Sequence, residues 1–85
     1  MKSYAVIFTY SFDDDTAVYL FDSEKEAVDF LRGSVMEEFR IDTEENGWDS
    51  SCNISDDGYY GEIKTNFFDR IDITEARIGH VYSAN

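Results

Sequence analysis

The chain has 85 residues, of which 42% are hydrophobic and 16% aromatic, so it can bury a modest core and form a single domain over residues 1–85. Nineteen acidic residues against seven basic ones give a net charge of −12, which opposes direct binding of nucleic acid or anionic membranes and attracts basic partners. No apolar run is long enough to span a bilayer, and the only cysteine, Cys52, has no internal disulfide partner. We therefore expect a cytoplasmic protein with no membrane partner.

The first twenty-one residues are typical of two strands. Residues 3–12 alternate with a period of two and are apolar on both faces, as in a central strand. Asp13, Asp14 and Asp15, followed by Thr16, predict a polar break of hairpin length. Residues 17–21 alternate again and predict the second strand.

Residues 23–40 predict the one helix. Ser23 and Glu26 have the spacing of a capping box, in which the hydroxyl accepts from the amide three residues later. One apolar stripe follows at spacings of three and four residues: Ala27, Phe30, Leu31, Val35 and Phe39. No other segment has this period, so we expect the stripe to cover the sheet.

Residues 41–85 carry weaker signals. Asn46-Gly47 indicates a helix end or a turn, so the helix either continues to about Glu45 or is followed by a separate turn over residues 41–47. Asp56-Asp57-Gly58 indicates a hairpin turn between strands at residues 51–55 and 59–66, and residues 73–82 predict the last strand. The predicted fold is α+β: one helix packed on a mostly antiparallel four- to five-stranded sheet, in the order β-β-α-β-β-β.

Catalytic and metal motifs are weak. Residues 42–53 resemble a calcium loop in their oxygen spacing and in Gly47, but the last position is Asn53, Asp49 occupies an apolar position, and a strand follows. His80 has no evident partner for acid–base work, and Cys52 has no basic neighbour to lower its pKa. We expect no cofactor, no metal and no enzymatic activity.

The acidic residues are concentrated in predicted loops. Residues 42–58 hold six acids and no base. Carboxylates spaced along a surface can stand where the phosphates of a nucleic acid bind a basic protein. The predicted partner-binding residues are Asp13, Asp14, Asp15, Asp42, Glu44, Glu45, Asp49, Asp56 and Asp57. The alternative is a small oligomerising or regulatory domain, such as a homodimer, whose acidity serves solubility.

The segments YAVIFTYSFDDDTAVYLFDSEKEAVDFL and RIDTEENGW resemble those of short proteins carried by bacterial mobile elements, including phages. In size, charge and aromatic content the chain is similar to acidic inhibitors of nucleic-acid-handling proteins, namely DNA mimics, anti-CRISPR proteins and nuclease inhibitors such as barstar. This resemblance implies a binding protein that inhibits a basic nucleic-acid-binding protein or nuclease. No family motif matches, so the resemblance transfers no functional residue.

Overall fold

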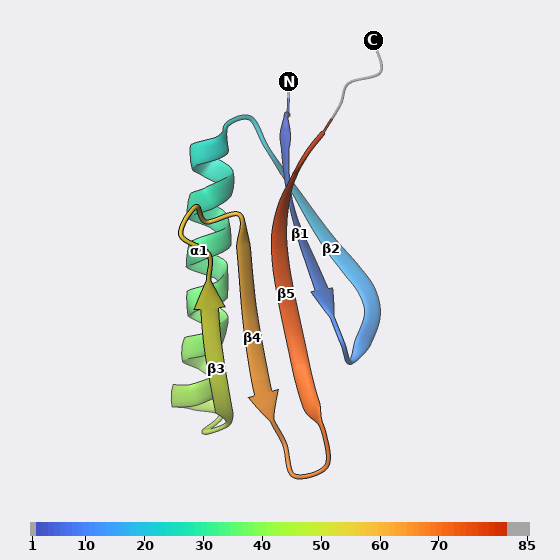
Figure 1. The fold of residues 1–85 in the computed structure, drawn as a ribbon, viewed down its shortest axis with the longest axis vertical. Helices are drawn as coiled ribbons and strands as arrows, with labels where there is room; N and C mark the ends of the chain where they lie inside the picture. The colour runs from blue at the N-terminus through green and yellow to red at the C-terminus, as the bar shows by residue number, and fades with distance from the viewer. Residues whose placement is uncertain (1, 82–85) are drawn as a thin grey trace.

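Five strands form one antiparallel sheet, and one helix lies across one of its faces (Figure 1). The computed structural model describes residues 2–81. The elements in chain order are β1 (Tyr4–Tyr10), β2 (Asp13–Phe21), α1 (Glu24–Arg40), a π-helical turn η1 (Ile41–Glu45), β3 (Asp49–Ile54), β4 (Tyr60–Asn66) and β5 (Ile71–His80). The predicted α+β class and element order are confirmed.

The strand order across the sheet is β2-β1-β5-β4-β3, so the last strand of the chain lies in the middle of the sheet. β5 pairs with β1 on one side and with β4 on the other, and every pairing is antiparallel. β1 is an interior strand as predicted, because Ala5 and Val6, which point to opposite faces, are both buried. β2 and β3 form the two edges.

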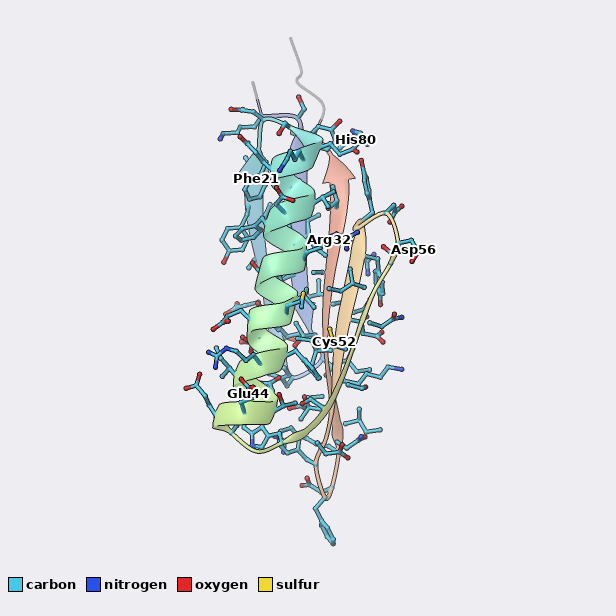
Figure 2. The ribbon with its side chains drawn as sticks, turned by 90° about the vertical axis from the view of Figure 1, so that its left-hand side faces the viewer. Phe21, Arg32, Glu44, Cys52, Asp56 and His80 are labelled. Carbon is cyan, nitrogen blue, oxygen red and sulfur yellow. The ribbon has the colours of Figure 1, made fainter. Side chains whose placement is uncertain are left out.

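Helix α1 supplies the apolar layer that covers the sheet. Ser23 is its N-cap, and the Ser23 hydroxyl accepts a hydrogen bond of 3.2 Å from the amide of Glu26. Ala27, Leu31 and Val35 are buried against the sheet, whereas Phe30 and Phe39 are partly buried beside them. The sheet contributes four buried side chains to the same core: Val6, Phe8, Ile63 and Ala76. Figure 2 shows the helix lying along the sheet.

The helix continues beyond Arg40, as the first of the two sequence alternatives predicts. Residues 41–45 form one wider turn, closed by a 2.9 Å bond from the amide of Asn46 to the carbonyl of Ile41. Gly47 then adopts a positive φ of 69°, which an L side chain rarely tolerates. The chain can therefore reverse and enter β3. In residues 2–81, no helix is both long and apolar enough to cross a bilayer.

The predicted polar break at residues 13–16 is wrong, because these residues belong to β2. The chain turns earlier, at Ser11 and Phe12, and the Ser11 hydroxyl accepts from the amide of Ile73 at 2.8 Å. Charged side chains are acceptable here because β2 is an edge strand with little covering it. Smaller differences lie in β3 and β5, which begin two residues earlier than predicted, and Tyr82 lies outside the described residues.

Candidate partner-binding surface

The carboxylates greatly outnumber the bases that can neutralise them. Six of the seven basic side chains form ion pairs, and these engage nine of the nineteen carboxylates. The seventh base, Arg32, instead donates to the backbone carbonyl of Asp56 at 2.9 Å. Ten carboxylates have no basic side chain within 4.0 Å in residues 2–81: Asp13, Asp14, Asp15, Glu24, Glu26, Glu38, Asp42, Asp49, Asp56 and Asp57.

The acids predicted to bind a partner do not form one continuous row. Residues 13–15 lie at the start of β2, and residues 42–49 lie where the helix ends and β3 begins, toward the same end of the molecule (Figure 1). Asp56 and Asp57 lie in the β3–β4 turn, away from Glu44 and toward the other end of the helix (Figure 2). The sheet therefore separates the predicted residues into an edge group, a helix-end group and a turn group.

Two of the predicted acids, Glu44 and Glu45, already share an ion-pair partner. The Arg40 guanidinium pairs with Glu45 at 2.9 Å, with Glu44 at 3.5 Å and with Glu37 at 2.7 Å. Arg40 is thus surrounded by three carboxylates on the exposed side of the helix. Glu44 and Glu45 contribute less uncompensated charge than their sequence positions indicate.

The β3–β4 turn supplies donors to its own carboxylate. Asp57 Oδ1 accepts from the amide of Tyr59 at 3.0 Å and from the Ser55 hydroxyl at 2.7 Å. These hydrogen bonds, the one from the Tyr59 amide foremost, lower the pKa of Asp57. The Tyr59 hydroxyl donates to Glu24 at 2.7 Å, and this bond raises the pKa of Tyr59 to about 12. The turn is consequently joined to the first turn of α1.

A groove runs between the helix and the sheet on the side of β1 and β2. Its first pocket has a volume of about 190 Å³. Four aromatic rings line it, together with Ser34, Glu38 and Thr74: Phe8, Tyr10, Tyr19 and Phe30. Tyr19 and Phe30 are in direct contact, with ring centroids 4.8 Å apart. The lining of this pocket is therefore mainly aromatic, and Glu38 contributes its one carboxylate.

A second pocket of about 200 Å³ continues the groove, since Glu38 and Thr74 line both pockets. Asp42 lies in this second pocket and is only 7% exposed. Its carboxylate has neither an ion-pair partner nor a hydrogen-bond donor in residues 2–81, and burial raises the pKa of Asp42. Burial, with a smaller contribution from the charge of Asp42, also raises the pKa of Glu38. The two carboxylates are neighbours without a counterion.

One arginine of the chain, Arg70, is among the residues that line the second pocket. The Arg70 guanidinium lies 4.7 Å from the ring centroid of Phe67 and pairs with Asp72 at 3.0 Å. Trp48 packs against the same Phe67 ring, with centroids 5.1 Å apart. The pocket thus combines stacked aromatic rings with carboxylates around a cation, a combination that suits a guanidinium.

The sequence analysis missed Glu38 and Asp72 because both lie within regular elements and not in loops. Glu38 follows Val35 by three residues, so helical spacing places it beside the apolar stripe, and that spacing was the available signal. Asp72 becomes part of the site only because β5 lies beside β4, with Asp72 opposite Thr65. Nothing in the local sequence indicates that pairing.

The other two candidate residues lie outside the groove. Cys52 is on β3, and burial raises the pKa of its thiol, which keeps it in the unreactive form. His80 ends β5, with its ring centroid 5.0 Å from that of Tyr4. In the part of the chain that the structure describes, no three His, Cys, Asp or Glu side chains are grouped so that they can hold a metal ion.

Comparison with known proteins adds no relative to these observations: no family model, curated protein or solved structure matches the chain.

Proposed function

We propose that the protein is an acidic binding protein that inhibits a basic nucleic-acid-binding protein, such as a nuclease, by occupying its nucleic-acid site. The observation that supports this proposal is the set of ten carboxylates in residues 2–81 that have no basic side chain within 4.0 Å. If acidity served only solubility, the unpaired carboxylates could be scattered over the whole surface. Here they are grouped in distinct regions. Seven of them are residues that the sequence analysis selects.

The uncompensated carboxylates lie in separate groups, so a basic partner would contact them at several separate points. Duplex DNA carries about one charge per 1.7 Å of axis, so a mimic needs charges spread over a surface. In this chain the uncompensated charges lie in three groups: residues 13–15 in the edge group, Asp42 and Asp49 in the helix-end group, and residues 56–57 in the turn group. Arginine and lysine side chains that normally contact phosphates would pair with them.

A competition experiment tests the proposal. The immobilised protein is used to capture proteins from a bacterial lysate at low salt, and each captured protein is then bound to labelled duplex DNA. We expect the free protein to displace the DNA, and we expect the displacement to weaken steeply as salt increases. Absence of any captured protein, or simultaneous binding of DNA and this protein, would contradict the proposal.

A pair of matched variants identifies the charges that matter. The first triple variant removes three uncompensated charges by changing Asp13, Asp14 and Asp15 to Asn. The second removes three charges that already have ion-pair partners, through Asp22→Asn, Asp29→Asn and Glu37→Gln. Both variants change the net charge equally. We expect the first to slow association with the captured protein and to flatten its salt dependence more than the second. Equal effects would mean that net charge alone attracts the partner.

A second candidate function, self-association, is favoured by the exposed edge of the sheet. In β2, Val18, Tyr19 and Leu20 are 54%, 46% and 48% exposed, and the outer backbone edge of the strand is unpaired. Such an edge can pair with another strand. Sedimentation at low and high salt discriminates between the two functions, because an apolar homodimer persists or strengthens when salt screens the charge of −12.

A further inference from the structure

We propose that the pocket around Asp42 binds the guanidinium group of an arginine side chain supplied by the basic partner. This inference rests on the proposed function and names the contact at which the partner would be held. The pocket is about 200 Å³ in volume and is bordered by Trp48, Phe67 and the carboxylates of Asp42 and Glu38.

The state of the Asp42 carboxylate indicates that a cation is the ligand. The residue is 93% buried, since only 7% of it is exposed, and no donor or base of residues 2–81 contacts its oxygens. No fully buried side-chain oxygen lacks a partner in the same residues, so the Asp42 oxygens must retain access to the pocket. Burial of most of the residue limits the hydration of a carboxylate that has no partner, and a bound cation would offset that cost.

The surroundings favour arginine over other cations. A metal ion needs several convergent oxygens, and residues 2–81 contain no such group. A guanidinium can stack on an aromatic ring and pair with a carboxylate at once, whereas an ammonium is a more strongly hydrated point charge. Arg70 does both in this pocket, with Phe67 and Asp72 as its partners. Asp42 and Glu38, with which Arg70 forms no ion pair, offer the same chemistry to a second guanidinium.

The test uses the whole protein and three small probes: the N-acetyl amides of arginine, of lysine and of citrulline, the neutral isostere of arginine. Each is titrated into isotopically labelled protein while backbone amide and Trp48 indole resonances are recorded. We expect saturable shifts at Glu38, Asp42 and Trp48 with the arginine amide, a dissociation constant in the millimolar range, weaker binding of lysine and no saturation with citrulline. Equal binding of citrulline would overturn the proposal.

Variants locate the site. Asp42→Asn should weaken arginine binding at least about tenfold and Glu38→Gln several-fold, whereas Asp29→Asn, which removes one exposed charge from the first half of α1, should leave it unchanged. Circular dichroism establishes that each variant is folded. Since Glu38 is exposed, Glu38→Gln tests the pocket independently of any effect that Asp42→Asn has on the fold. Unchanged arginine binding in both groove variants, or shifts centred on residues 56–57, would contradict the assignment.

This experiment and the DNA competition fail independently. If arginine binds at Asp42 but the protein does not displace DNA, the arginine pocket is supported and the proposed function is rejected. Displacement of DNA without arginine binding would keep the proposed function and reject the pocket.

Discussion

Asp57, in the turn between β3 and β4, and Asp42, in the groove at the end of α1, differ in their hydrogen-bond donors: in residues 2–81 only Asp57 has them. Asp57 accepts two hydrogen bonds, and these lower its pKa. Asp42 accepts none from residues 2–81, and burial raises its pKa. Two aspartates fifteen positions apart in one acidic stretch therefore have opposite electrostatic roles. The charge of Asp57 stabilises the fold, whereas the charge of Asp42 has no partner within residues 2–81.

The two regions also differ in how tightly they are held. The turn is joined to α1 by Arg32 donating to the carbonyl of Asp56 and by the Tyr59 hydroxyl donating to Glu24. Gly58 packs directly on the helix. By contrast, Gly47, next to the groove, has no atom within 4 Å of the position that a Cβ would take. The closely packed turn and the open surroundings of Gly47 thus lie along the same helical segment.

The largest expected effect concerns these two glycines, which both have positive φ values, 77° at Gly58 and 69° at Gly47. A Cβ at Gly58 would lie 2.6 Å from Cγ1 of Val28 and 2.9 Å from Nε of Arg32. Gly47→Ala should cost about 1–2 kcal/mol of unfolding free energy for the left-handed backbone alone. Gly58→Ala should cost roughly 2–5 kcal/mol, because overpacking adds to that strain.

Urea denaturation of the two glycine variants measures this difference. Equal losses of unfolding free energy would mean that the β3–β4 turn does not pack against the helix in solution, and the contrast between the two regions would fail.

The next effect is a pair of opposite pH dependences. The raised pKa of Asp42 means that its charged form destabilises the native state, so stability falls as pH rises above the ordinary aspartate pKa of about 3.9. The lowered pKa of Asp57 means that its charge stabilises the native state above that value, and this contribution is lost as pH falls through the folded pKa. At pH 7, Asp42→Asn should therefore raise the melting temperature and Asp57→Asn should lower it.

Melting curves from pH 2 to pH 7 test the assignment for Asp42 and Asp57. Both differences from the wild type should shrink toward zero at the acid end, where each aspartate is protonated in the folded and unfolded states. Shifts of the same sign at pH 7 would show that the two carboxylates have similar surroundings, contrary to the comparison.

The smallest effect is expected at Asp49, an exposed residue at the start of β3. Its carboxylate accepts one hydrogen bond, 3.3 Å long, from the Asn66 amide group. Asp49→Asn should change the unfolding free energy by no more than about 0.5 kcal/mol, as is usual for exposed positions. Thermal denaturation at neutral pH checks this value. A larger loss would identify Asp49 as structural and remove it from the predicted binding residues.

Local patterns in the sequence predict most of the secondary structure. The capping pair Ser23 and Glu26, the apolar stripe and Gly47 together define where α1 begins, which side it buries and where the helical segment ends. Each signal acts over a few residues, so it does not depend on distant parts of the chain. The charge of 42–58 likewise follows from composition, and it predicts a basic partner without tertiary information.

Long-range pairing decided the remaining features. β5 could have joined either edge of the sheet, and its position between β1 and β4 depends on how the two hairpins share one apolar face with α1. That position brings Asp72 to the groove, leaves β2 as an edge strand that can carry Asp13, Asp14 and Asp15, and divides the acidic residues among separate regions. Burial of Asp42 depends on the same packing, because the residues around it come from α1, the segment before β3, the strands β4 and β5 and the turn between them. Charge can be counted in a sequence, but whether a carboxylate is hydrated, paired or left without a partner depends on what the fold packs around it.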